Sequence, residues 1–288
     1  MQRLFALLAG ISLTACGIQI DHDEKTGDIK SINVSVAELG ERGNGSEKTE
    51  TRSITAVSEV QADGAIDVEV SIGDTPSLTV SGDANLLKLI VTEQQGSQLR
   101  IRAERSFSSN NPVRVKLVTP ALKAARHAGS GELAVDGLKG GDFALDVTGS
   151  GDTRLAGKVD TLTAHLVGSG DLDADQLQPG KVDLDVLGSG DVSLGRVSVD
   201  TFKAAVKGSG SVTASGSAKQ LTGNVLGSGD LNLGDLHAEA ADVSVMGSGD
   251  IAIFASQSVK ATASGSGEVT VAGKPAKTEI HGENVSLQ

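Results

Sequence analysis

The carboxylates of a repeated Gly-Ser-Gly-Asp motif are the side chains of this 288-residue chain best spaced to do chemistry. The first glycine of each copy is Gly129, Gly149, Gly168, Gly188, Gly208, Gly227, Gly247 or Gly265. The position after the second glycine holds Glu132, Asp152, Asp171, Asp191, Ser211, Asp230, Asp250 and Glu268. Copies that stack would place these carboxylates about 5 Å apart, where like charges repel and a divalent cation such as Ca²⁺ would relieve the repulsion.

Those carboxylates have a second possible role, which is structural. An aspartate next to a turn commonly accepts a hydrogen bond from a backbone amide. Ser211 interrupts the column of acids, and this interruption favours turn formation over a cation ladder. If a metal is bound, its ligands are expected among Asp152, Asp171, Asp191, Asp230 and Asp250, with Ca²⁺ as the cofactor.

The chain begins with features of an exported lipoprotein. Met1-Gln2-Arg3 is a short positive segment, and residues 4–13 are apolar but too few to span a bilayer. Leu13-Thr14-Ala15-Cys16 resembles the lipobox of bacterial lipoproteins, in which the cysteine becomes acylated. The alternative is an ordinary signal peptide with an incidental cysteine. Acyl chains on Cys16 would anchor the protein in a membrane, and in such lipoproteins a residue like Gly17 after the cysteine implies the outer membrane.

Composition restricts the partners further. The net charge of −12 argues against nucleic acid and against an electrostatic grip on anionic lipid. There is no Trp and no Tyr, so the core must consist of small aliphatic side chains. Cys16 is the only cysteine, so no internal disulfide can form. Residues 16–52 are charged and poor in large apolar groups, which predicts a flexible tether with one possible short strand at residues 32–36.

The repeat predicts the architecture. The second, fourth and sixth residues before each first glycine are mostly apolar, and the alternation resumes after the motif. A unit of about 20 residues cannot bury its own apolar face, so units must stack. We therefore predict an all-β protein, a right-handed parallel β-helix (β-solenoid), with two clear strands and a weaker third in each coil. A β-propeller is the alternative, but its blades need about 40 residues.

Four regions follow from this pattern. Residues 1–15 are the signal peptide, 16–52 the lipidated cysteine and tether, 53–128 an irregular β-rich cap and 129–288 the repeat β-helix. Strands are expected in the cap at 65–72, 77–82, 87–93, 98–104 and 113–119. Residues 121–129 have helix propensity, but the phase of the repeat makes them a strand with Ala125 and His127 facing inward. His127 is then either a hydrogen-bonded core histidine or a sign of a shifted register.

The position just before each motif carries a run of large apolar residues that should face outward. It holds Val167, Leu187, Leu226 and Met246, with Lys207 between them. These side chains either pack under the corner loop, which we favour, or form an exposed ridge that contacts a partner or a second copy of the chain.

Catalysis is the least favoured function. Some β-helices cleave polysaccharides, and Asp183 with Asp185 is an outward acid pair. The five histidines are scattered, with His165 and His237 at different positions in their coils. Phe143 and Phe202 occupy a core column and are expected to pack rather than bind sugars.

The segments "SEVQADGAIDVEVSIGDTPSLTVSGDANLLKLI", "GSQLRIRA" and "VTPALKAARHAGSGEL", followed by the Gly-Ser-Gly-Asp repeats, resemble the head GIN domain family. The resemblance covers about residues 54–287. It implies an exported, non-catalytic β-helical head with an adhesin-like role as a binding or scaffold module, whose partner is a surface polymer or protein. A structural envelope lipoprotein without a specific ligand is the alternative.

Overall fold

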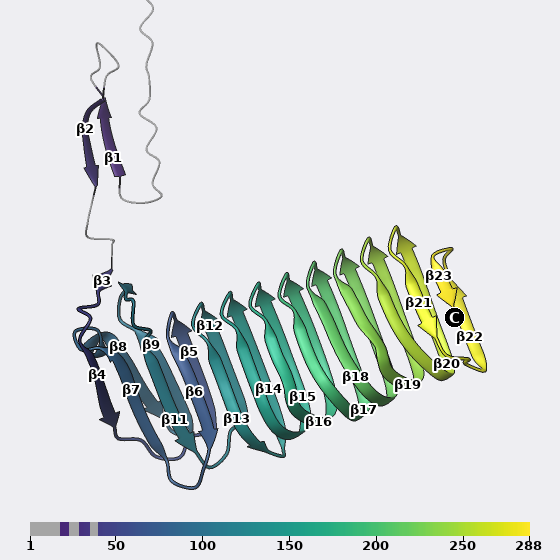
Figure 1. Cartoon of the computed structure of the whole chain (residues 1–288), viewed down its shortest axis with the longest axis horizontal. Helices are drawn as coiled ribbons and strands as arrows, with labels where there is room; N and C mark the ends of the chain where they lie inside the picture. The colour runs from purple at the N-terminus through teal and green to yellow at the C-terminus, as the bar shows by residue number, and fades with distance from the viewer. Residues whose placement is uncertain (1–17, 23–28, 35–39) are drawn as a thin grey trace, which may run out of the picture.

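The computed structural model describes residues 18–22, 29–34 and 40–288, and Figure 1 shows them as a long stack of strands with an irregular end. The described chain is β-structure apart from one 3₁₀ turn, η2 (Leu87–Leu89). In this part of the chain no helix is long and apolar enough to cross a membrane. The signal peptide and Cys16 lie outside the described residues.

The repeats form a parallel β-solenoid, as predicted. Its strands are β12 (Ala124–Gly129), β13 (Leu133–Lys139), β14 (Asp142–Gly149), β15 (Thr153–Gly168), β16 (Leu172–Gly188), β17 (Val192–Gly208), β18 (Ser211–Gly227), β19 (Asp230–Gly247), β20 (Ile251–Gly265), β21 (Val269–Ala272), β22 (Lys277–His281) and β23 (Val285–Leu287). From β15 to β20 each strand pairs in parallel with the next, and equivalent glycines lie opposite one another.

Each coil from β15 to β20 differs from the prediction in one respect, because it holds a single long strand rather than two strands and a weaker third. The ladder of parallel pairs passes the middle of the coil with only a local shift of register, for example between Leu194 and Arg196. It breaks at the Gly-Ser-Gly motif, and between β16 and β17 it also lacks pairs in the middle of the coil, between Asp173 and Lys181. The sharp corner is therefore where each of these coils leaves the extended conformation, although Gly157 and Gly216 inside β15 and β18 also have positive φ.

The glycines of the motif answer a steric need at that corner. Gly188 has φ +135°, a conformation that L side chains rarely adopt. A Cβ atom on Gly188 would also collide with the carbonyl oxygen of Gly168 in the coil before, and one on Gly190 would collide with that of Gly170. The corner therefore requires glycine for close stacking of successive backbones.

The inward columns form one continuous core along the rod. Phe143 and Phe202 are 2% and 0% exposed, which confirms their predicted packing role. The weaker third column is buried too; it consists of Leu138, Val159, Leu177, Val197 and Leu236. The core is mostly aliphatic, as the composition indicated.

His127 lies in the core with the register that the repeat predicts. It is 1% exposed and pairs with Ala62 of the cap on one side and Val147 on the other. Neither ring nitrogen has a hydrogen-bond partner, and the hydroxyl of Thr153, another buried polar side chain, has none either. Burial lowers the pKa of His127, an effect that the charge of Asp67 partly opposes.

The cap continues the stack and adds antiparallel pairs. Its elements are β3 (Glu41–Arg42), β4 (Glu47–Arg52), β5 (Glu59–Gly64), β6 (Asp67–Ile72), β7 (Ser77–Asp83), β8 (Ile90–Gln95), β9 (Gln98–Ala103), β10 (Phe107–Ser108) and β11 (Arg114–Thr119). β5 and β6 pair in parallel with β12 and β13, which joins cap and solenoid in one sheet. β7 pairs antiparallel with both β4 and β11, and β8 with β9.

The predicted boundary of the tether at residue 52 is wrong, because residues 40–52 belong to the cap. β4 pairs with β7 along its whole length. The Arg52 guanidinium also donates to the backbone carbonyl of Leu87, at 2.9 Å. Backbone pairing and side-chain hydrogen bonds order this polar segment without an apolar face. Further towards the N-terminus, β1 (Ile18–His22) and β2 (Ile29–Val34) pair antiparallel, and β2 covers part of the expected strand at 32–36.

Candidate binding surface

The carboxylates of the motif link each coil to the next. The Oδ1 atom of Asp152 accepts a hydrogen bond from the backbone N–H of Asp171 at 3.0 Å, and that of Asp171 accepts one from Asp191 at 2.8 Å. Further along, Asp230 and Asp250 accept in the same way from Asp250 and Glu268, each at 2.8 Å. The amide that donates to each aspartate therefore belongs to the next coil and not to the aspartate's own turn.

The chain of hydrogen bonds is interrupted at Ser211, where the column of acids is also interrupted. Asp191 accepts from both the backbone N–H and the hydroxyl of Ser211, each at 2.8 Å. Ser211 has no carboxylate to offer Asp230, whose N–H donates to the carbonyl of Gly210 instead, at 3.1 Å. Ser211 thus donates to the aspartate of the coil before it, but it has no carboxylate that could accept a hydrogen bond from the coil after it.

These hydrogen bonds give the aspartates a structural role that needs no cation. Across the residues described, no three His, Cys, Asp or Glu side chains are grouped so as to hold a metal ion. One oxygen of each capping aspartate faces an amide. The carboxylates keep a second oxygen for other contacts on this corner.

The apolar residues before the motif are exposed, and our expectation that they pack under the corner loop is wrong. The exposed fractions are 45% for Val167, 36% for Leu187, 51% for Leu226 and 60% for Met246. The reason lies in the corner itself. The motif is too tight to form a covering loop. The backbone N–H of its serine donates to the carbonyl of the first glycine in the previous coil, as that of Ser189 does to Gly168 at 2.8 Å.

We call these four residues the ridge. In the sheet Val167 lies opposite Leu187, and Leu226 lies opposite Met246. Lys207 occupies the same column between Leu187 and Leu226. Its ammonium group pairs with Asp185 at 3.2 Å, so the cation that interrupts the ridge already has a counter-charge.

Two of the remaining candidates for catalysis, His165 and Asp185, lie opposite each other on neighbouring coils. Asp185 is paired with Lys207, while its neighbour Asp183 is exposed. The ring of His237 stacks on Phe254 with centroids 4.3 Å apart. His165 lies exposed on another coil, opposite Asp185.

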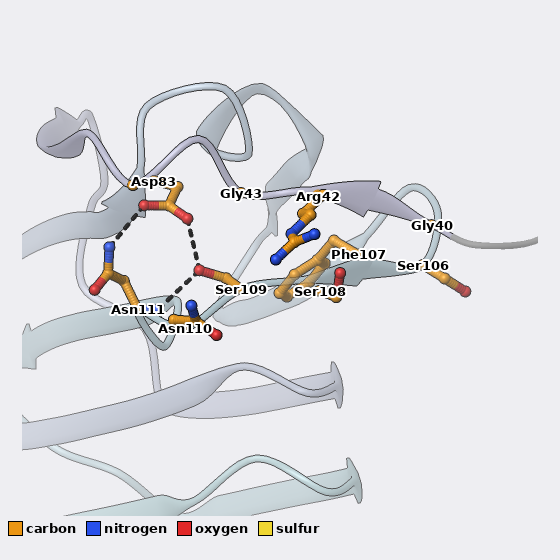
Figure 2. A pocket seen from close by; sticks show the side chains of 11 residues that line it. Gly40, Arg42, Gly43, Asp83, Ser106, Phe107, Ser108, Ser109, Asn110 and Asn111 are labelled. Carbon is orange, nitrogen blue, oxygen red and sulfur yellow. Dashed lines mark hydrogen bonds between the residues drawn. The ribbon is translucent and has the colours of Figure 1, made fainter.

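A cavity of about 800 Å³ lies at the edge of the cap, and sequence reasoning missed the residues that shape it. Figure 2 shows Asp83 between Ser109 and Asn111, whose side chains donate to its carboxylate at 2.6 and 2.8 Å. The hydrogen bonds from Ser109 and Asn111 lower the pKa of Asp83. The only sequence signal was that these residues fall between the predicted strands of the cap. Asp83 here joins loops that are far apart in the sequence, and its carboxylate is fully used in doing so.

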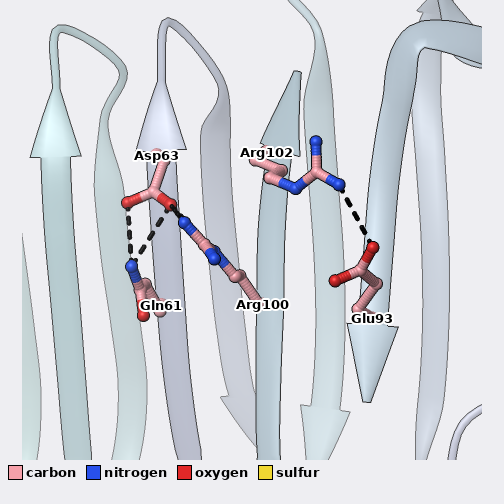
Figure 3. A network of polar contacts seen from close by, with 5 residues as sticks. All are labelled: Gln61, Asp63, Glu93, Arg100 and Arg102. Atoms are coloured by element: carbon pink, nitrogen blue, oxygen red, sulfur yellow. Dashed lines mark hydrogen bonds and ion pairs between the residues drawn. The ribbon is translucent and has the colours of Figure 1, made fainter. Parts of the chain in front are cut away.

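Some of the charged side chains elsewhere on the rod are neutralised by neighbours. On the outer face of the cap, Arg100 pairs with Asp63 at 3.0 Å and Arg102 with Glu93 at 3.2 Å (Figure 3). On the repeats, further ion pairs join Arg126 to Asp146, Arg154 to Asp173 and Lys219 to Asp200. The corner carboxylates take part in none of the ion pairs found among the described residues.

Solved structures share this fold. An adhesin described as putative from Parabacteroides merdae aligns with a TM-score of 0.67 at 20% identity, over 85% of this chain and 97% of its own. A putative adhesin from Parabacteroides distasonis aligns with 0.65 at 22% identity, over 86% and 99%. A putative lipid binding protein from the same species aligns with 0.62 at 25% identity, over 85% and 97%. No curated protein matches the chain.

A family profile matches residues 56–195 and 165–275, which together span most of the solenoid and the cap. Its description is "Putative auto-transporter adhesin, head GIN domain". The matched segments contain the Gly-Ser-Gly corners, the capping aspartates and the ridge. The chain therefore belongs to the head GIN domain family.

Proposed function

We propose that this chain is the non-catalytic, adhesin-like head of an envelope lipoprotein that acyl chains on Cys16 hold in the outer membrane. The description of its family and the names of two similar structures support the adhesin-like role. The observation that carries the proposal is the ridge. Four large apolar side chains stand exposed in register on a rod whose other outer columns are mainly polar or charged.

Exposing the apolar ridge to water is energetically unfavourable unless a partner covers it. Exposed apolar groups restrict the water around them and are unfavourable, and contiguous apolar patches mark interaction sites more often than isolated apolar residues do. The tether and the lipid would place the rod away from the membrane surface, where the ridge meets other molecules. A head without a ligand would gain nothing from these side chains.

The experiment compares retention under flow of bacteria that produce the full chain with bacteria that lack it, on protein-coated and polysaccharide-coated surfaces. We expect the full chain to increase retention, and Leu226→Ser with Met246→Ser to abolish the increase. The matched control is Asn224→Ala with Ser244→Ala, which changes the same two strands two residues away and should retain wild-type adhesion. Equal retention with and without the chain would leave the structural lipoprotein as the better description.

A further inference from the structure

The ridge shares its corner of the rod with a second column, which is acidic. We call Glu132, Asp152, Asp171, Asp191, Asp230, Asp250 and Glu268 the acid column. Each stands four residues after a ridge-column position, and four residues of chain span at most about 14 Å. Between the two columns stand the motif serines, all of them exposed. The edge therefore presents an apolar line and a line of carboxylates side by side.

The charge on this edge is not neutralised within the protein. Some acids on neighbouring columns have cationic partners, as Asp146 has Arg126 and Asp173 has Arg154. No Lys or Arg of the described chain forms an ion pair with any member of the acid column. Lys207, which lies between Leu187 and Leu226, is paired with Asp185 instead. The edge keeps a net negative potential along its length.

From these observations we infer that the edge docks a basic amphipathic polypeptide segment. Its apolar side chains cover the ridge while its Lys or Arg side chains meet the acid column. This inference rests on the proposed function and names the chemistry of the partner. The partner needs both apolar and cationic side chains, because the edge presents an apolar column and an acidic column together.

The dimensions of the edge agree with such a segment. Coils repeat about every 4.8 Å, so the ridge from Val167 to Met246 extends about 19 Å. A helix of about 13 residues has that length at 1.5 Å per residue. Its apolar stripe would follow the ridge, and its flank would carry cations at the distance of the acid column.

A second copy of this chain fits less well. It would bring another acid column against the first, and like charges at close range oppose association. The four ridge side chains also provide much less than the roughly 800 Å² per partner that a stable interface buries. A narrow partner of opposite charge suits this surface better than a broad one of like charge.

The test uses the full chain with Cys16→Ser, which removes the proposed acylation site and leaves every described residue unchanged. The probe is a fluorescent 14-residue peptide with leucines at helical three- and four-residue spacing and lysines elsewhere, followed by anisotropy. We expect saturable binding that weakens about tenfold between 50 and 300 mM NaCl, because salt screens exposed charges. A peptide with glutamate in place of lysine, and one with serine in place of leucine, should not bind.

Variants separate the two columns. Leu226→Ser with Met246→Ser, and Asp171→Asn with Asp191→Asn, should each weaken binding about tenfold. Asparagine keeps the oxygen that caps the next coil, so the second pair changes charge with little effect on the fold. Asp183→Asn with Asp242→Asn removes the same charge from an exposed outer column and should leave binding unchanged.

Several results would overturn the inference. They are absence of saturable binding, equal binding of the serine peptide, or equal loss from the Asp183 and Asp242 control. Saturable Ca²⁺ binding that displaces the peptide and is lost in Asp171→Asn with Asp191→Asn would make the edge a cation site instead. If bacteria adhere through the ridge but the peptide does not bind, only the partner's chemistry is wrong. If adhesion itself is independent of the chain, the proposed function fails separately.

Discussion

The Oδ1 atom of Asp171 accepts a hydrogen bond from the backbone N–H of Asp191 at 2.8 Å, and the two residues occupy the same position in successive coils. A repeated side chain here fastens one repeat to the next. The motif is therefore architectural first, and its exposed charge is available to a partner only because one oxygen is enough for the cap.

This role predicts a difference between two substitutions of the same residues. Replacing Asp171 and Asp191 with alanine should lower the free energy of unfolding by about 0.5–1.5 kcal/mol for each lost hydrogen bond. Replacing both with asparagine should cost much less, because the amide oxygen can accept the same N–H. Denaturant unfolding of four single variants, with alanine or asparagine at Asp171 or at Asp191, measures these losses. Equal losses for alanine and asparagine would show that charge, not capping, matters for stability.

The corner glycines predict a large effect from a single methyl group. Gly188→Ala should destabilise the solenoid by at least about 1–3 kcal/mol from backbone strain alone, because Gly188 has φ +135° and its Cβ would meet the carbonyl of Gly168. Gly234→Ala is the matched control in the long strand β19. It has no atom within 4 Å of its added Cβ and should change the melting temperature little. Similar melting curves for both variants would refute the steric account.

Buried His127 predicts acid sensitivity. Its folded pKa lies below the ordinary value of 6.5, because burial penalises the charged ring. The unfolded chain therefore binds the proton first, and stability present above pH 6.5 declines as the pH falls toward the lowered pKa of the folded state. The residue joins the cap to the repeats, so the amides of β5, β12 and β14 should lose protection from hydrogen exchange in acid, relative to the intrinsic exchange rate at each pH.

Substitution of His127 tests that assignment. His127→Leu places an apolar side chain in a column that already holds Leu166, and it should raise the free energy of unfolding by about 1–3 kcal/mol. It should also remove much of the decline below pH 6.5. His165→Gln, on the exposed outer face, should leave the pH profile as it is. An unchanged profile in His127→Leu would place the acid-sensitive group elsewhere.

The proposed anchor has a direct test in cell fractionation. Cys16→Ser should move the full chain from the membrane fraction to the soluble fraction, since acyl chains supply about 0.8 kcal/mol of membrane affinity per buried CH₂. Mass spectrometry should find the acyl chains on the wild-type chain only. Recovery of both proteins in the soluble fraction would support the ordinary signal peptide.

The sequence alone determined the coil, because each coil is specified by local chemistry repeated at a constant interval. Alternating apolar residues mark the buried face, and the paired glycines mark the corner. The strand at residues 124–129 followed from this phase despite its helix propensity, since stacking against β5 and β14 outweighs a weak local preference.

The tertiary structure decided what depends on contacts between distant residues. The amide that Asp171 caps lies one coil away, and the carboxylate of Asp83 is held by side chains 26 and 28 residues further along the chain. Residues 40–52 read as a tether because their order comes from pairing with β7 rather than from an apolar pattern of their own. The exposure of the ridge was decided in the same way. An apolar side chain at a corner is covered or bare according to how tightly the next coil packs there, and that tightness becomes visible only when the coils are stacked.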